Sequence, residues 1–405
     1  MGALELAGVE NERQTILVAG GLMRRAGQRD LERLLPRPEA RAFRGSVVVH
    51  DAEDEGLRPL ARGVRAHPAL LETDLVLVVG AAETVLHGGP AALARACDAA
   101  TGRRAVVASS LLEASSAPGW ELALELESAL GARTPLIGVS LVLDLPRATG
   151  VLRGYPEDPR AVRRVERSWT RTILSGMPGS LRRAALDRQG RRVAATAVFA
   201  GSPSVAHAEA LVRGVELRGT RVDEPVDALV VGVPWVGPHL PREPANPITA
   251  AAVALGLALR LHRDSPPIVE GGTLVLAHPF TRSFGRGEAP YATMLETLRS
   301  AGGQHELDAL EAAAAQDVRA LAEYRAGHAC HPLLPYADWA SCGPALAHLG
   351  RVVVAGCRDA TAARALGVVP SHGVTSALQM AHGVAGGRAR VGVLLAPPYP
   401  PLLVG

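Results

Sequence analysis

The sequence contains no lysine, so all 43 of its basic residues are arginine. Without a lysine amine the chain forms no Schiff base, offers no P-loop lysine and tethers no cofactor through an amine. Aromatic residues make up only 3% of the chain, and its net charge is +3. Nucleic-acid binding usually needs a strongly basic surface with stacking side chains. We therefore expect no nucleic-acid partner.

Cysteine and long apolar runs are also scarce. The four cysteines share no CxxC spacing: Cys97, Cys330, Cys342 and Cys357. A reducing, cytoplasmic location fits this pattern. The longest apolar helical run, residues 248–261, is too short to cross a bilayer. Residues 1–12 are acidic and lack the pattern of a signal peptide. We expect a cytoplasmic protein with no membrane partner.

The chain repeats a short β-branched run, a glycine-containing turn and an amphipathic segment rich in Ala, Leu and Arg. This pattern is typical of parallel α/β sheets. The predicted strands are 15–19, 46–50, 74–80, 105–108, 135–143, 193–199, 227–233, 272–276, 351–355 and 390–395. The predicted helices are 27–35, one beginning near Pro90, 248–261, 309–324 and 371–384. Residues 147–192 show no simple period.

The length of 405 residues predicts two domains. A charged, proline-containing segment at 218–225 suggests the boundary, which gives domains 1–220 and 221–405. The fold class we predict is α/β, with two domains of parallel or mixed sheets flanked by helices and a cleft between them.

Ligands of open parallel sheets bind beyond the carboxyl ends of the strands. The loop Glu83–Pro90 follows a buried-type strand and combines a carboxylate, an imidazole and two glycines. We predict His87 as a general acid or base, with Glu83 raising its pKa or orienting it, and Gly88 and Gly89 as cofactor-binding residues. The plain alternative is a histidine that only caps the next helix.

Three other loops follow predicted strands. In GGLMRR, Arg24 and Arg25 are candidates for binding a substrate carboxylate, as are His278 and Arg282 in HPFTRSFGR. A tight turn or an ordered surface loop would explain these residues equally well. The third loop, WVGPHLPREPAN, offers hydrogen-bond donors at His239, Arg242 and Asn246, or it serves only for packing between the domains.

Two other chemistries have little support. The Cys and His residues of one region match no zinc-site spacing: His328, Cys330, His331, Cys342 and His348. The sequence also lacks the GxSxG elbow of Ser/His/Asp hydrolases. We predict no metal site made by these side chains.

The segment DLVLVVGAAETVLHGGP resembles the N-terminal domain of the nickel-dependent lactate racemase family. ILVAGGLMRRAGQRDLERLL looks like the family's strand, loop and helix that normally carry a Gly-x-His-Arg turn. The second half, from DALVVGVPWVGP through GGTLVLAHPF, is similar to the family's C-terminal domain. The resemblance therefore covers most of the chain, and only the segment from Glu83 to Pro90 matches sharply.

The resemblance implies inversion of the hydroxyl-bearing carbon of a 2-hydroxy acid. In the family, a nickel-pincer nucleotide accepts and returns a hydride, while two histidines exchange the hydroxyl proton. His87 matches one of these histidines. At the position of the other, this chain has Met23 and Arg24, and Arg24 or Arg25 corresponds to the family's arginine.

Several family features are missing. The cofactor-tethering lysine of the Ser-Gly-Gly-x-Lys segment is absent, since this region reads HGGPAALARAC. A second family lysine, in the helix at 247–261, and the early Asp-Asp-x-Thr-Arg segment are absent too, as if the chain began late in the first domain. Three interpretations stay open: a racemase or epimerase with a noncovalently held cofactor, a diverged relative that binds a small carboxylate, and a truncated, inactive copy or a subunit that completes its site with another chain. We expect a hydroxy acid or related carboxylate as ligand and leave a homo-oligomer open.

Overall fold

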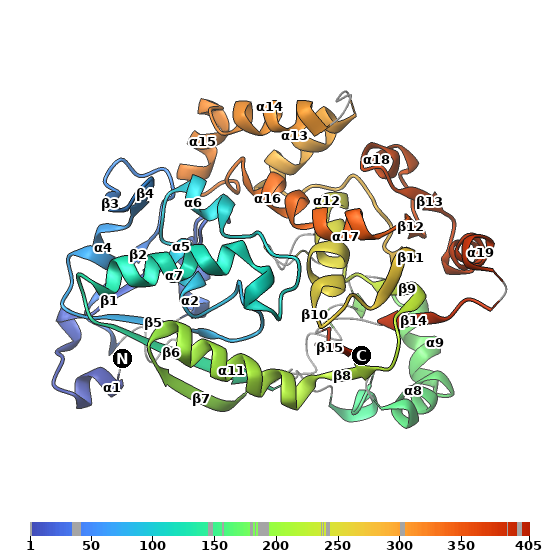
Figure 1. The fold of residues 1–405 in the computed structure, drawn as a ribbon, viewed down its shortest axis with the longest axis horizontal. Coiled ribbons are helices and arrows are strands. Elements are labelled where there is room, and N and C mark those ends of the chain that lie inside the picture. The colour runs from blue at the N-terminus through green and yellow to red at the C-terminus, as the bar shows by residue number, and fades with distance from the viewer. Residues whose placement is uncertain are drawn as a thin grey trace.

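In a computed structural model, the chain forms two groups of sheets (Figure 1). One apolar core connects the two groups. The structure describes residues 2–34, 42–144, 149–155, 158–178, 181, 182, 184, 194–235, 237, 239, 244–299, 304–386, 388–394 and 399–405. None of the described helices combines the length and apolar character that crossing a bilayer requires.

Residues 15–201 form three small sheets. Strands β1 (Thr15–Val18) and β2 (Ser46–Val49) pair in parallel, and β3 (Arg58–Ala61) and β4 (Val64–Ala66) form an antiparallel pair. The third sheet has the order β5-β6-β7, with bounds Val76–Ala81, Leu136–Leu143 and Ala195–Gly201. β5 and β6 are parallel, whereas β7 is antiparallel to β6. This sheet places the loop that follows β5.

The second half contains a five-stranded, wholly parallel sheet in the order β13-β12-β11-β9-β14. In that order, the strands span Val369–Ser371, Arg351–Ala355, Ile268–Ala277, Val226–Gly232 and Val391–Leu394. Apolar clusters cover both faces, which explains the continuous apolar runs of β9, β11 and β12. The chain order reverses between β9 and β14. Ligand sites in open α/β sheets usually lie at such a reversal, beyond the carboxyl ends of the strands.

A smaller parallel sheet joins the end of the chain to the segment between the two halves. It has the order β10-β15-β8, with bounds His262–Arg263, Leu402–Val404 and Thr220–Val222. β15 lies in the centre and pairs with both neighbours.

Helices flank the sheets. Those of the first half are α1 (Gly2–Leu6), α2 (Gln28–Leu34), α4 (Pro68–Leu71), α5 (Ala91–Ala94), α6 (Ala99–Arg104), α7 (Pro118–Gly131), α8 (Pro159–Glu166), α9 (Trp169–Gly176) and α11 (Pro203–Arg218). Those of the second half are α12 (Pro247–Ala251), α13 (Ala289–Leu298), α14 (Gln304–Ala314), α15 (Val318–Arg325), α16 (Leu334–Ser341), α17 (Gly343–His348), α18 (Ala360–Ala365) and α19 (Val374–Ala385). α11 packs on β6 and β7, and α19 packs on β11 and β12.

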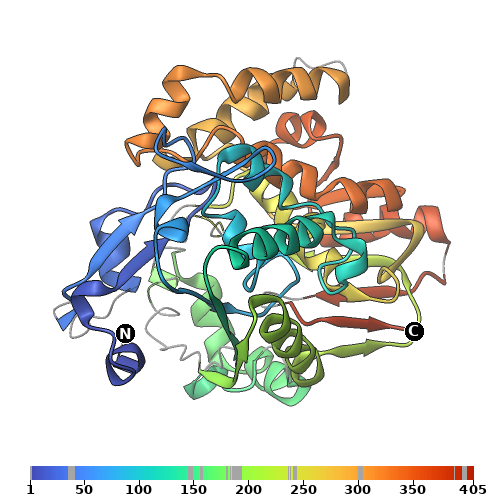
Figure 2. The same cartoon turned by 60° about the vertical axis from the view of Figure 1, so that its left-hand side comes forward.

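The two halves share their largest apolar cluster. Leu86 and Trp120 from the first half are buried in the same cluster as Leu255 and Tyr324 from the second. Burying such side chains gives the main stabilisation of a fold. Figures 1 and 2 show α14 and α15 reaching over the first half, where Arg103 of α6 forms a bidentate ion pair with Glu311 of α14.

The predicted fold class is confirmed: α/β, with parallel and mixed sheets flanked by helices. The boundary after residue 220 and the cleft between domains stay predictions. One predicted strand, 105–108, is wrong. Its backbone is engaged by other groups, since Gly119 N donates to Val107 O at 2.9 Å and the guanidinium of Arg260 donates to Ala108 O.

Two predicted helices differ in detail. The helix expected at 309–324 is two helices: α14 ends at Ala314, and Asp317 caps α15 by accepting from the amides of Arg319 and Ala320. The helix expected at 248–261 begins as α12 and continues through a π-turn, Ala252–Leu257, and a 3₁₀ turn, Ala258–Arg260. Within residues 147–192, where no period was visible, the structure has α8 and α9.

Candidate functional site

His87 lies in the loop that follows β5. The hydroxyl of the buried Thr84 is hydrogen-bonded to His87 Nδ1 at 2.7 Å and also accepts from the amide of Leu86 at 3.2 Å. These contacts fix the ring, and no described residue forms a hydrogen bond with its Nε2. His87 itself is exposed. The structure therefore presents a held, solvent-accessible imidazole at the carboxyl end of a strand.

Glu83 does not orient this ring. Its side chain is exposed and faces Arg218, with 3.9 Å between Oε1 and Nη1. Thr84 has the orienting role that the sequence suggested for Glu83. A catalytic role for Glu83 stays a prediction.

Gly88 and Gly89 allow the loop to lie directly on α11. Both have positive φ angles, +100° and +50°, which favour glycine. A Cβ on Gly88 would come within 2.4 Å of Ala81 O, and one on Gly89 within 2.4 Å of the Cβ of His207. His207 in turn donates from Nε2 to Thr84 O at 2.9 Å. Packing thus explains both glycines, and their cofactor role stays a prediction.

Charged residues from both halves surround His87. Although solvent reaches the ring, desolvation by the surrounding protein lowers the pKa of His87, and the positive charges of Arg95, His239 and Arg260 lower it further. Of these residues, only Arg95 belongs to the first half. The lowered pKa therefore favours the neutral form of His87 near pH 7.

Arg95 ends the short helix α5, and its carbonyl accepts from the amide of Gly21 at 3.0 Å. The residue is half-buried, and burial lowers the pKa of its guanidinium, which nevertheless remains charged because arginine pKa values lie so high. Among the described residues, no carboxylate forms an ion pair with Arg95. A half-buried guanidinium without a carboxylate partner is suited to binding an anion.

His239 follows β9, the strand at the chain-order reversal, and is paired with Asp338 of α16. Its Nε2 lies 3.0 and 3.1 Å from the two carboxylate oxygens, and the Tyr291 hydroxyl donates to the same carboxylate at 2.7 Å. Burial lowers the pKa of His239, but the charges of Asp338 and Glu288 outweigh burial and the net pKa is raised. Burial and Asp338 also raise the pKa of Tyr291.

The two histidines are therefore shifted in opposite directions. The lowered pKa of His87 favours its neutral form, which accepts a proton or a hydrogen bond, whereas the raised pKa of His239 favours its protonated form, which donates one. Environments that separate the pKa values of two neighbouring groups are a common basis of acid and base roles. Together with Arg95, these side chains form what we call the His87 site.

Arg24 and Arg25 are engaged by carboxylates. Arg24 Nη2 lies 2.8 Å from an oxygen of Asp30, and Arg25 Nη1 lies 3.3 Å from an oxygen of Asp51. Neither arginine is among the groups whose charge acts most on His87. Their proposed binding of a substrate stays a prediction, while their observed contacts hold loops of the protein together.

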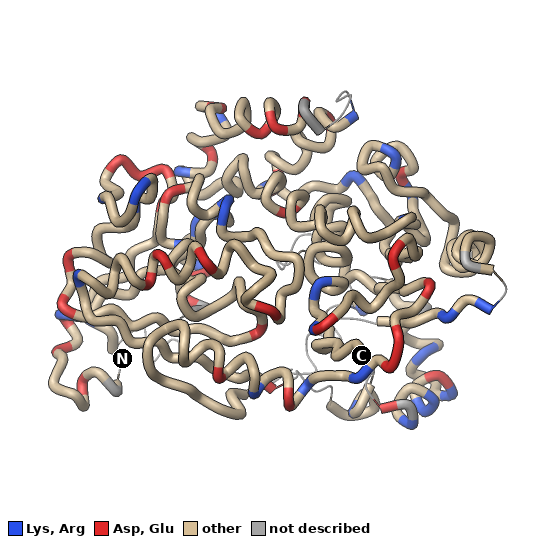
Figure 3. The backbone as a smooth tube through the Cα atoms, in the orientation of Figure 1, with Lys and Arg blue, Asp and Glu red and all other residues tan. Residues whose placement is uncertain are grey.

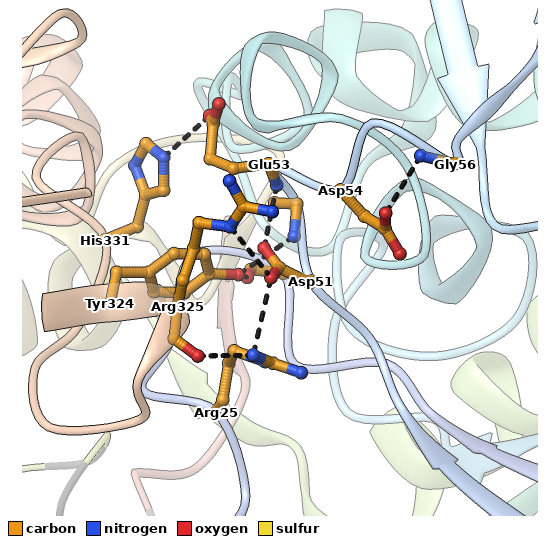
Figure 4. A network of polar contacts seen from close by, with 10 residues as sticks. Arg25, Asp51, Glu53, Asp54, Gly56, Tyr324, Arg325 and His331 are labelled. Atoms are coloured by element: carbon orange, nitrogen blue, oxygen red, sulfur yellow. Dashed lines mark hydrogen bonds and ion pairs between the residues drawn. The ribbon is translucent and has the colours of Figure 1, made fainter. Parts of the chain in front are cut away.

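Figure 4 shows how Arg25 takes part in a network between the two halves. Asp51, which follows β2, lies between Arg25 and Arg325 at the end of α15, with a distance of 3.7 Å to Arg325 Nε. The adjacent Glu53 meets Nε2 of the buried His331 at 3.0 Å. The Tyr324 hydroxyl lies in the same network and accepts from the amide of Ala52 at 3.0 Å.

His278 and Arg282 follow β11 and also have structural contacts. His278 is 3% exposed, and burial lowers its pKa to about 4. Its Nδ1 accepts from the amide of Phe280, which has a positive φ of 43°. Arg282 forms ion pairs with Asp359 at 2.6 Å and Glu296 at 3.1 Å. Their proposed binding of a substrate stays a prediction.

Sequence reasoning missed Arg95 and Asp338. Arg95 stands in an alanine-rich segment of a chain with many arginines, and Asp338 lies in a helix without a recognisable motif, so neither carried a signal. His239 was noticed as a hydrogen-bond donor, but its pairing with Asp338 depends on how α16 packs. Among the described residues, no group of three or more His, Cys, Asp or Glu side chains is placed to hold a metal ion.

The fold is similar to that of solved proteins. The lactate racemase apoprotein from Thermoanaerobacterium thermosaccharolyticum aligns with a TM-score of 0.58 and 12% identity, over 97% of this chain and 78% of that chain. A structural-genomics protein from Thermotoga maritima aligns with a TM-score of 0.49 and 12% identity, over 96% of this chain and 86% of that chain. No protein-family model and no curated protein matches the chain. The first comparison shows a lactate racemase-like fold.

Proposed function

We propose that this lactate racemase-like protein binds a small 2-hydroxycarboxylate at the His87 site. The observation that carries the proposal is one exposed imidazole, held by Thr84, whose pKa is lowered by desolvation and by the charges of Arg95 from its own half and His239 from the other. An arrangement of this kind offers positive charge to a carboxylate and a hydrogen-bond acceptor to a neighbouring hydroxyl group.

Each side chain has a distinct task in this proposal. Arg95 binds the carboxylate, because a planar guanidinium matches the two oxygens of that group. His239, whose pKa is raised by Asp338, adds a second donor and, when protonated, a second positive charge. Neutral His87 accepts a hydrogen bond from the substrate hydroxyl and, as a general base, takes its proton. Thr84 keeps the ring in place for this step.

The residues do not fit a lysine-tethered nickel-pincer cofactor. The chain has no lysine, and the two glycines of the His87 loop lie against Ala81 and His207, where a Cβ would collide with protein atoms and not fill an open cradle. We therefore assign no step to that cofactor. The proposed role is that of a diverged relative which binds a small hydroxy acid and exchanges a proton with it.

A panel of small acids tests the proposal. L-lactate, D-lactate and glycolate should raise the unfolding temperature of the purified protein, whereas propionate, which lacks the hydroxyl, should stabilise it less, because at equal concentration a ligand that binds the folded state more tightly stabilises it more. The stabilisation should be lost in His87→Ala and Arg95→Met. Arg104→Met, a change of an exposed arginine on α6, is the matched control. Absence of stabilisation by every acid, or equal stabilisation of all variants, would contradict the proposal.

Racemisation is the second candidate, and the fold similarity favours it. It would require a noncovalently held cofactor, so metal analysis and intact mass spectrometry of the protein purified from its native host distinguish the two functions. Nickel near one equivalent per chain, together with interconversion of D- and L-lactate, would support racemisation. Acid binding without nickel and without interconversion would support the binding function alone.

A further inference from the structure

Strand β7 ends its sheet. In the described part of the chain, β7 pairs with β6 on one side and with no strand on the other. Its sequence, ATAVFAG, contains no charged residue and no proline, and most of its residues are exposed. Figure 1 places β7 at the lower edge of the molecule, and Figure 3 shows it without charged positions. Unprotected edge strands offer backbone groups for pairing with another chain.

A groove lies where β7 meets α11. It has a volume of about 420 Å³, and its walls come from β7 and α11: Phe199, Ala208, Glu209, Val212, Arg213 and Glu216. Val212 of α11 is 60% exposed, and Val198 of β7 is also 60% exposed. Exposed apolar side chains next to unpaired strand edges are typical of protein interfaces.

We propose that β7 and α11 form a two-fold interface with a second copy of this chain. In this dimer, the two β7 strands pair antiparallel and the two α11 helices pack antiparallel beside them. Each Phe199 and Val212 then packs against apolar groups of the other copy. The inference is independent of the proposed ligand, since it uses a different part of the molecule.

The charges of α11 favour a second copy over an unrelated peptide. A two-fold interface uses one patch twice, so the patch must be complementary to itself. With the axis near Val212, Arg213 of one antiparallel helix lies opposite position 211 of the other, and so within about one helical turn of Glu209 in the second copy. Arg213 already lies 3.0 Å from Glu216 of its own helix. The patch therefore carries positive and negative side chains, and the two-fold axis brings those of one copy close to opposite charges of the other.

Charge reversal on α11 tests the interface. The molar mass of the full chain is measured by size-exclusion chromatography with light scattering at several protein concentrations. We expect a dimer for the wild type. Glu209→Arg and Arg213→Glu should each raise the dimer dissociation constant about tenfold or more, because each places like charges opposite one another. The combination of both reversals should restore the wild-type value, because opposite charges meet again.

Folding of each variant is checked by its far-UV circular dichroism and its unfolding temperature. Arg299→Glu, a reversal at the C-cap of α13 away from β7, is the matched control and should leave the dissociation constant unchanged. Val198→Arg on β7 leaves Glu209 and Arg213 unchanged and should still weaken the dimer. A monomeric wild type, as expected if an extended peptide of another protein occupies the groove, overturns the inference. So does a dimer that the α11 reversals and Val198→Arg leave unchanged.

Discussion

The imidazole of His239 and the carboxylate of Asp338 form a hydrogen-bonded pair, with Nε2 lying 3.0 and 3.1 Å from the two oxygens. This contact joins the loop after β9 to α16, and it raises the pKa of a histidine that follows the five-stranded sheet. The pair thus favours the protonated form of His239, opposite to the effect of the surroundings on His87.

Replacement of Asp338 by Asn should lower the pKa of His239. Asn removes the negative charge and keeps an oxygen that accepts from Tyr291. Because the folded pKa of His239 is raised above its ordinary value of 6.5, the pair stabilises the fold fully below that pH, and this contribution is lost as the pH rises through the folded pKa. NMR titration of the histidine Cε1 protons measures the shift. Glu296→Gln, a change in an exposed ion pair, is the control. An unchanged His239 titration would contradict the assignment.

Removal of the Arg95 charge should raise the pKa of His87, because that charge is the largest electrostatic cause of its depression after desolvation. The same NMR titration of Arg95→Met measures the effect. Loss of a charge-assisted hydrogen bond of about 1.5–3 kcal/mol should also weaken binding of a 2-hydroxy acid about 10- to 100-fold. Arg104→Met should change neither quantity. A His87 pKa that stays the same in Arg95→Met would show that the two side chains do not interact.

Replacement of Tyr324 by Phe should destabilise the protein. The Tyr324 hydroxyl accepts from the amide of Ala52 and donates to the carbonyl of Gly21, both at 3.0 Å, so its loss leaves two groups of the first half without this partner. We expect a loss of about 1–3 kcal/mol in the free energy of unfolding, measured by urea denaturation. Tyr399→Phe, which removes one bond to the carbonyl of Gly232, should cost less. Equal losses in the two variants would contradict this account of the network in Figure 4.

Acid should destabilise the fold partly through His278. Burial lowers the folded pKa from 6.5 to about 4, so the unfolded chain takes up a proton first and stability falls as the pH decreases between these values. The full difference corresponds to about 3 kcal/mol. His278→Asn keeps an acceptor for the amide of Phe280 and should flatten this dependence in urea denaturation at pH 7 and pH 4.5. His372→Asn, a change of an exposed histidine, should keep the wild-type slope. An equal slope in both variants would exclude this role of His278.

Local sequence was a good guide where one element alone determines the structure. Strands β9, β11 and β12 were predicted from their continuous apolar runs. Such runs are typical of strands buried on both faces, and the structure buries them in this way. The segment 105–108 failed as a strand because distant groups, including Arg260, use its backbone. His87 was predicted as a site residue because it lies in the loop that follows a strand.

Other site residues depend on how loops and helices pack together. Asp338 acts on His239 across 99 positions, and the charge of Arg95 at the end of α5 acts on His87 in the loop before α5. Neither relationship leaves a pattern in nearby residues. The same holds for Thr84, whose hydroxyl orients His87 only because the loop turns back on itself. These contacts had to be seen in three dimensions.

The small sheet that contains β15 has a consequence for handling the protein. Because β15 is the middle strand between β8 and β10, removing residues 402–404 would separate β8, the stretch leading from one half to the other, from its neighbour. Deletion of these residues would thus make the connection between the two halves less rigid, so a tag or truncation at this position should be avoided.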